Sequence, residues 1–97
     1  MYEVLLTEKA SADLAWFRVS EQRLILDGII ENLTTQPTLP TRNRKLLRPN
    51  PIASWALRLG EYRVFYDVAA EDALVTVLAI GHKDHNDLYV QGERVVI

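Results

Sequence analysis

The sequence contains no cysteine, and this absence excludes both a disulfide framework and thiolate chemistry. It also has no apolar run that approaches the length of a membrane-spanning helix. Near the N-terminus, Glu3, Glu8 and Lys9 interrupt the stretch in which a signal peptide would carry its apolar segment. We therefore expect a cytoplasmic protein with no membrane partner.

The net charge is also small, at −2 over 97 residues, which argues against general binding to nucleic acid. Its distribution is uneven, because residues 1–41 carry −3, residues 42–63 carry +5 and residues 64–97 carry −4. A basic segment between two acidic ones is more typical of a local binding site than of a need for solubility. The length predicts one small domain, residues 1–97, with a modest core.

The first forty residues predict one strand and two helices. Residues 2–6 are apolar enough for a short strand, and Thr7 can cap a first helix. Ser20 is a second candidate cap, and the apolar stripe that follows it continues until Pro37 ends the helix. Gly28 in the middle of that stripe costs about 1 kcal/mol relative to alanine, so we expect it to allow a close approach to the first helix.

Residues 55–66 predict a β-hairpin almost to the residue. Apolar and other side chains alternate in residues 55–59 and 62–66, and Gly60 suits the first central position of a two-residue type II′ turn. This turn pairs Leu59 with Tyr62 and places Arg58 opposite Arg63 on one face. The other face is a core face of Trp55, Leu57, Leu59, Tyr62, Val64 and Tyr66.

Residues 74–80 are nearly all apolar and predict a central strand, whereas residues 93–97 fit either a short strand or a docking tail. The order strand, helix, helix and three strands predicts an α+β fold (β-α-α-β-β-β). In this fold the two helices form a hairpin against one face of an antiparallel sheet.

Two basic features require an explanation. Like charges opposite each other in a strand pair are destabilising, so Arg58 and Arg63 suggest an anion site, although both could simply be solvated, with one paired to Asp67. The segment 38–51 has three prolines and no periodicity, which predicts a loop. Its basic residues suit either phosphate contacts or a solvated connector. These residues are Arg42, Arg44, Lys45 and Arg48.

The segment 81–89, GHKDHNDLY, concentrates titratable groups after a strand. If it is helical, His82, His85 and Tyr89 share one face. Three interpretations are open: a metal site, a plain polar turn, or general acid–base groups beside the arginines. With only two histidines and no other cluster of ligands, we expect neither a metal nor a cofactor.

Ribonuclease chemistry without a metal needs few groups. A base removes the proton from the 2′-hydroxyl, whose oxygen attacks the adjacent phosphorus, while cations hold the extra charge on the phosphoryl oxygens. An acid then protonates the leaving 5′-oxygen. Histidine suits either proton role, arginine suits charge stabilisation, and tyrosine can stack on a base.

The pattern W-x-L-R-x-G-x-Y-R-V-x-Y, then V-x-V-L-x-I-G-H-K and a tyrosine six residues later, resembles the RelE/ParE toxin superfamily. These are toxins of bacterial and archaeal toxin–antitoxin pairs, and the similarity covers nearly the whole chain. Members that act on the ribosome are usually basic, so the net charge here departs from them. The resemblance implies that Arg63, Lys83 and Tyr89 line an active face, with His85 at a position that is often basic.

The expectation is therefore a toxin that cleaves messenger RNA on the ribosome and is bound by a cognate antitoxin. The alternative is a ParE-like toxin that inhibits DNA gyrase without catalysis. The expected catalytic residues are Arg63, Lys83, His85 and Tyr89. The expected phosphate-binding residues are Arg42, Arg44, Lys45, Arg48 and Arg58. Convergence of Arg58, Arg63, His85 and Tyr89 on one concave face would favour the enzyme, whereas scattered positions would favour the binding module.

Overall fold

Residues 1–97 are described by a computed structural model whose elements follow the caps and periodicities of the sequence. The helices are α1 (Glu8–Ala15) and α2 (Val19–Leu33), and residues 70–72 form a single 3₁₀ turn. The strands are β1 (Glu3–Leu6), β2 (Arg44–Leu46), β3 (Trp55–Leu59), β4 (Tyr62–Ala69), β5 (Leu74–Asp84), β6 (Asp87–Val90) and β7 (Glu93–Val95). No helix is long and apolar enough to span a lipid bilayer.

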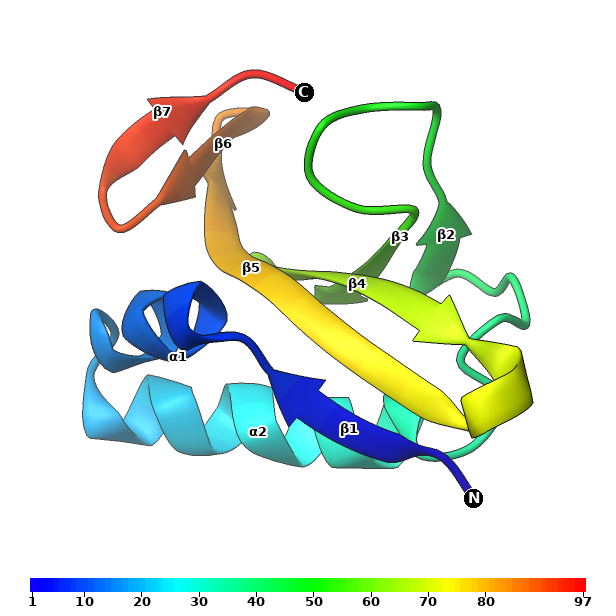
Figure 1. The fold of residues 1–97 in the computed structure, drawn as a ribbon. Coiled ribbons are helices and arrows are strands. Elements are labelled where there is room, and N and C mark those ends of the chain that lie inside the picture. Colours follow the sequence, from blue (N-terminus) through cyan, green and yellow to red (C-terminus); the bar gives the residue numbers. More distant parts are fainter.

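Figure 1 shows both helices against one face of the sheet, here called the helix face. The β6 and β7 strands and the loop between β2 and β3 rise from the other face, here called the open face. Two helices packed on one face of a mainly antiparallel sheet confirm the predicted α+β fold. The C-terminus lies between the β6–β7 hairpin and the β2–β3 loop (Figure 1).

The β5 strand is the centre of the sheet, as its apolar sequence predicted. The strands run in the order β2-β3-β4-β5-β6-β7 with antiparallel neighbours, and β1 pairs with β5 in parallel. On one edge of β5, residues 74–77 pair with β1 and residues 82–84 pair with β6. The two strands therefore share one edge, and a gap of four residues separates their pairings.

The main core fills the space between the helix face and the helices. Ile25, Ile29 and Leu33 of α2 are almost completely buried in one cluster with Leu57 and Val64 of the sheet. Each such side chain contributes about 1.5–3 kcal/mol relative to an exposed one. Gly28 lies against this sheet, because an added Cβ would sit 2.5 Å from Leu59 Cδ1. The expected contact of Gly28 with the first helix is therefore wrong; the glycine admits a strand side chain instead.

Both helix starts use side chains near the predicted positions. The Thr7 hydroxyl oxygen accepts a hydrogen bond from Ala10 N at 3.0 Å and caps α1, as predicted. The predicted cap at Ser20 is wrong, since α2 begins at Val19 and Arg18 occupies the cap position. The reason is Glu21, whose carboxylate accepts from Arg18 N at 3.2 Å and so satisfies a backbone donor at the helix start.

The β3–β4 hairpin has the predicted register, with Leu59 opposite Tyr62 and Arg58 opposite Arg63. Gly60 has φ +62°, which the first position of a type II′ turn requires. Further along, Phe65 pairs with Ala79 but Tyr66 pairs with Val77, so β5 carries an extra residue at this point. Such a bulge bends and twists a strand, and Figure 1 shows β5 bending along its length.

The segment after residue 80 is not helical, so His82, His85 and Tyr89 do not share a helical face. β5 continues to Asp84, His85 and Asn86 form a turn with φ +51° and +70°, and β6 returns along β5. Two successive positive φ values favour a hairpin, and asparagine tolerates this conformation well. The 38–51 loop prediction is also wrong in part, because residues 44–46 form β2 against β3. Residues 93–95 form a strand.

A second, smaller core lies on the open face. Ala53, Phe65, Ala79 and Leu88 are buried together, and they come from the β2–β3 loop and from β4, β5 and β6. This cluster holds the loop and the β6–β7 hairpin against the sheet. The space between the loop and the hairpin contains the candidate site.

Candidate functional site

A pocket of about 310 Å³ opens on the open face between the β2–β3 loop and the C-terminal hairpin. The charged residues that line it are all basic: Arg42, Lys45, Arg58, Arg63 and Lys83. Its apolar lining consists of Leu47, Ala56, Phe65, Leu88 and Ile97, with Asn43 as the remaining polar residue. No aspartate or glutamate side chain lines this basic pocket beside its five basic side chains.

The two arginines at the centre come from β3 and β4. Arg58 and Arg63 are direct cross-strand partners, so both side chains leave the sheet on the open face. Arg63 Nη1 donates to the backbone oxygens of Gly60 at 2.7 Å and Tyr62 at 2.9 Å. Burial, and then the charge of Arg58, lower the pKa of Arg63 from its ordinary value. Arg63 is therefore fixed in position by neutral carbonyls while its charge remains available to an anion.

Lys83 reaches the pocket from β5. Its backbone N donates to the Glu61 oxygen at 2.8 Å, which ties this part of β5 to the β3–β4 turn. Gly81, two residues earlier, pairs with Arg63 and has no side chain on the open face. A Cβ there would collide with the carbonyl oxygen of Tyr89, so the glycine allows the backbone of β6 to lie close to β5 at this position.

The basic segment supplies only some of its residues to the pocket. Lys45 of β2 pairs with Ala56 of β3 and lines the pocket. Arg42 lies in the loop before β2 and also lines the pocket. Arg44 points to the other side, because alternate residues of a strand face opposite ways. Its guanidinium donates to Leu39 O at 3.0 Å and to Asn32 O at 3.0 Å near the end of α2. Arg44 therefore connects β2 to α2.

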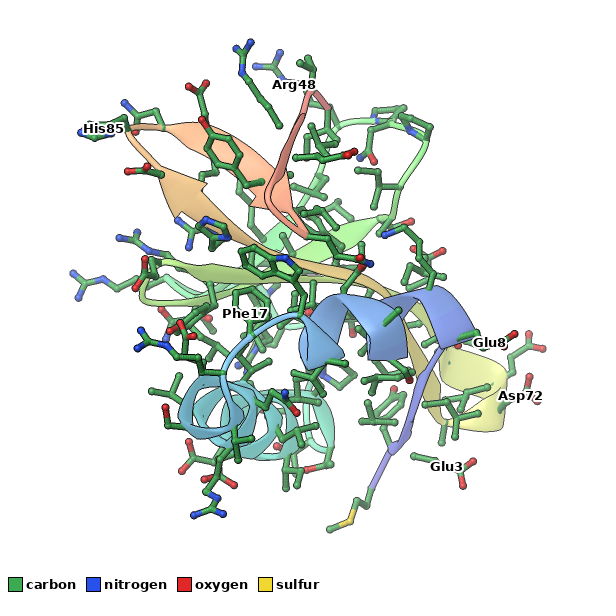
Figure 2. The ribbon with its side chains drawn as sticks, turned by 90° about the vertical axis from the view of Figure 1, so that its left-hand side faces the viewer. Glu3, Glu8, Phe17, Arg48, Asp72 and His85 are labelled. Carbon is green, nitrogen blue, oxygen red and sulfur yellow. The ribbon has the colours of Figure 1, made fainter.

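Three further predicted site residues lie outside the basic pocket. Arg48 lines a separate hollow formed by the β2–β3 loop itself. His85 occupies the β5–β6 turn with a side chain that is 93% exposed, and its Nδ1 is 2.9 Å from Asp84 Oδ1. Figure 2 shows His85 at the outer tip of that hairpin. Tyr89 lies opposite His82 on the helix face. Of the four residues whose convergence on one concave face would favour the enzyme, Arg58 and Arg63 share the basic pocket, whereas His85 and Tyr89 lie outside it.

His82 and Tyr89 instead belong to an aromatic stack on the helix face. The His82 ring lies 5.8 Å from Trp16 at an interplanar angle of 10°, and 5.6 Å from Tyr89 at 22°. Phe17 meets the His82 ring edge to face at 6.0 Å. The period of two explains the separation, since His82 and Lys83 are neighbours in β5 and must leave the sheet on opposite faces.

Sequence reasoning did not identify Asp13, a fully buried carboxylate in α1. Asp13 Oδ2 accepts from Ile80 N at 3.1 Å and from Lys9 Nζ at 2.8 Å, while Oδ1 accepts from Gln91 at 2.7 Å. Ile80 lies in the gap between the β1 and β6 pairings, so Asp13 takes the place of a strand there. The available signal was an acid within the apolar stripe of α1, three residues after Ala10.

No group of three or more histidine, aspartate or glutamate side chains is placed to hold a metal ion. The fold and the open-face pocket define a small α+β protein with a cationic surface opposite its helices. Residues 4–86 match the family described as the ParE toxin of the type II toxin-antitoxin system parDE, and the chain belongs to this family. The predicted membership of the RelE/ParE toxin superfamily is thereby confirmed.

Two solved structures have a similar fold. One is the RelBE2 toxin-antitoxin complex of Mycobacterium tuberculosis, with a TM-score of 0.73 and 26% identity over 84% of this chain and 98% of that chain. The other is the archaeal RelE-RelB complex of Pyrococcus horikoshii OT3, with a TM-score of 0.68 and 21% identity over 87% of this chain and 97% of that chain. No curated protein is similar enough in sequence to count as a match.

Proposed function

We propose that this toxin is an endoribonuclease that cleaves messenger RNA in the ribosome at the basic pocket. The observation that carries the proposal is a concave site lined by five basic side chains and by no aspartate or glutamate. A phosphodiester gains negative charge on its phosphoryl oxygens during cleavage, and preorganised cations are the groups that stabilise this charge. Arg63, which two backbone carbonyls fix in position, is the best placed of them.

Chemically, the 2′-oxygen attacks the adjacent phosphorus, the bond to the 5′-oxygen breaks, and a cyclic phosphate and a 5′-hydroxyl result. One proton leaves the 2′-hydroxyl and one reaches the 5′-oxygen. Arginine keeps its proton, whereas lysine can exchange one. Lys83 and Lys45 are the two lysines that line the pocket, so we assign proton transfer to them. In this proposal Arg58 and Arg63 hold the phosphate, and Phe65, buried at the floor, limits the room for water.

We also propose a cognate antitoxin as the partner. Both similar structures were solved as toxin–antitoxin complexes. An acidic antitoxin segment across the basic pocket would neutralise its charge and block RNA. Association should then be fast at low ionic strength and slower in salt. Replacing Arg42 and Lys45 together by glutamine should flatten that salt dependence, whereas the same change at Arg48, outside the pocket, should not.

A second candidate is inhibition of DNA gyrase by binding alone. The observation that favours it is the absence of histidine, tyrosine, aspartate and glutamate from the pocket lining, together with the ParE family match. A binding surface needs no group that exchanges protons. In this alternative the five cations would contact the gyrase–DNA complex as a positive patch.

One paired experiment decides between the two. The toxin is expressed under a tight promoter, cleavage is mapped on cellular transcripts, and the purified protein is added to a gyrase supercoiling assay. We expect transcript cleavage that Arg63→Ala lowers by about 10²–10³. The matched control Arg23→Ala removes an arginine of α2 that lies outside the pocket, and it should leave cleavage unchanged. Intact transcripts with inhibited supercoiling would reject the nuclease and support the alternative.

A further inference from the structure

A second hollow of about 400 Å³ lies on the helix face at the same end of the sheet as the basic pocket. Four rings line it: Trp16 and Phe17 from the α1–α2 connection, Tyr62 from β4 and His82 from β5. We call it the aromatic pocket. Because Tyr62 precedes Arg63 and His82 precedes Lys83, the two strands present the aromatic pocket on one face and the basic pocket on the other.

The charged side chains around the aromatic pocket are mainly acidic, whereas those of the basic pocket are all basic. Glu21 Oε2 accepts from the Tyr62 hydroxyl at 2.7 Å, and Oε1 lies 3.4 Å from Arg18 Nε. The hydrogen bond from Tyr62 lowers the pKa of Glu21, so this carboxylate is ionised. Glu61 is exposed in the β3–β4 turn and forms no ion pair. Two carboxylates against one arginine repel the phosphates of a nucleic acid and attract a cation.

Two features of this pocket are unfavourable in the free protein. Trp16, a large apolar ring, keeps 49% of its surface exposed. His82 Nδ1 is buried without any hydrogen-bond partner, although a buried polar atom normally has one. An apolar side chain at residue 82 would fill the stack without this loss. Neither feature serves the basic pocket, so both point to a separate role for this surface.

We propose that the aromatic pocket binds an arginine side chain of a partner protein. A guanidinium is flat and weakly hydrated, so it stacks on aromatic faces, and its paired N–H groups match a carboxylate. Trp16 supplies a half-exposed ring and Glu61 an unpaired carboxylate in the same hollow. Because the sheet separates the two sites, a partner held here leaves the basic pocket open. The proposal does not depend on the nuclease assignment.

The test uses the two tryptophan indole N–H signals in a ¹H–¹⁵N spectrum of the full chain. The probe is a blocked glycine-rich peptide with a single arginine, and the matched peptide carries citrulline, which keeps the shape but lacks the charge. We expect the arginine peptide to move the Trp16 signal saturably and to leave Trp55 in place, because Trp55 is buried in the core. The citrulline peptide should leave both signals in place.

Variants assign the effect to the pocket. Glu61→Gln removes an exposed charge at a position that packs against nothing in the core, and it should weaken peptide binding about fivefold. Arg63→Ala, on the opposite face, should leave peptide binding unchanged whether or not it abolishes cleavage. The proposal is overturned if citrulline binds as well as arginine, or if Trp16 does not respond. It is also overturned if uridine monophosphate moves Trp16 and the arginine peptide does not.

Discussion

Arg58 and Arg63 face each other directly across β3 and β4, and no carboxylate lies within ion-pairing distance of either guanidinium. A like-charged cross-strand pair is destabilising by several tenths of a kcal/mol, about as much as an opposite pair stabilises. The fold tolerates this cost at the centre of a pocket whose other charged residues are also basic. Such an arrangement suits a surface that binds an anion.

The first prediction follows from that cost. Arg58→Thr removes one charge of the pair and adds a residue that favours strands, so the free energy of unfolding should rise by about 0.2–1 kcal/mol. Cleavage should fall, because the pocket loses a phosphate contact. Urea denaturation and cleavage of a ribosome-programmed transcript measure the two effects. A variant that loses stability would show that Arg58 has a structural partner instead.

The second prediction concerns proton transfer. Lys83→Met keeps the length of the side chain and removes the amine, so cleavage should fall by about 10²–10⁴ while the fold is retained. His85→Gln should have little effect, since His85 lies on an exposed turn outside the pocket. Both variants are compared in the same cleavage assay at matched protein concentration. If His85→Gln loses activity and Lys83→Met does not, the role predicted for His85 from the sequence holds and the lysine assignment fails.

The third prediction concerns Arg44 and Lys45, which are neighbours in β2 but face opposite sides of the sheet. Arg44→Ala removes hydrogen bonds from a charged donor to two backbone oxygens, so it should lower the free energy of unfolding by about 1.5–3 kcal/mol. Lys45→Ala should change stability by less than about 0.5 kcal/mol. It should instead weaken RNA binding and reduce the magnitude of the salt slope by about 1. Equal effects of the two variants on RNA affinity would contradict this division.

Local signals explain which parts of the fold the sequence revealed. The β3–β4 register was predictable because Gly60 and the alternation on either side of it act over a few residues. The β5–β6 hairpin was not, because its polar turn lacks an apolar period and Leu88 is fixed by a second core that includes Ala53, far away in the chain.

Some residues of the candidate site could be predicted from local sequence signals, and others could not. The arginine pair was predictable from hairpin geometry, whereas the segment 38–51 has no alternation from which to tell Lys45 from Arg44. Asp13 could not be predicted from the sequence for a different reason. Its partners Ile80 and Gln91 are 67 and 78 residues away, and only the folded chain shows that the gap beside β5 needs an acceptor.

The fourth prediction compares two glycines. At Gly81 a methyl group would meet the backbone oxygen of Tyr89, which cannot move without displacing β6, so Gly81→Ala should cost about 1–3 kcal/mol. At Gly28 the methyl group would meet the end of the flexible Leu59 side chain, and alanine gains about 1 kcal/mol in helix propensity. Gly28→Ala should therefore be nearly neutral. Thermal unfolding of both variants checks the contrast, and a reversed order would contradict it.

The fifth prediction concerns alkaline pH. A hydrogen bond to Glu21 raises the pKa of Tyr62 to about 12, and burial raises that of Tyr66 to about 12, against 10.0 in the unfolded chain. Above about pH 10 the unfolded chain releases these protons while the folded chain keeps them. The contribution of these two groups to the free energy of unfolding should therefore not change with pH below about pH 10, and it should fall as the pH rises towards 12.

The matched variant is Tyr66→Phe, which also loses the hydrogen bond from the hydroxyl to Pro37 O at 2.6 Å. We expect lower stability at neutral pH by about 0.5–1.5 kcal/mol and a shallower decline above pH 10. Urea midpoints measured from pH 8 to 12 show both effects. An unchanged slope would mean that Tyr66 does not contribute to the alkaline loss.

The alternation of side chains along β5 also restricts how this protein can change in length. A one-residue insertion after Ile80 would move Lys83 to the helix face and His82 to the open face, exchanging the chemistry of both pockets at once. Insertions of two residues preserve the faces, and so does a single insertion that the strand absorbs as a bulge, as β5 does beside Phe65. Homologous chains that keep both pockets should therefore differ in length here by even steps or by an added bulge.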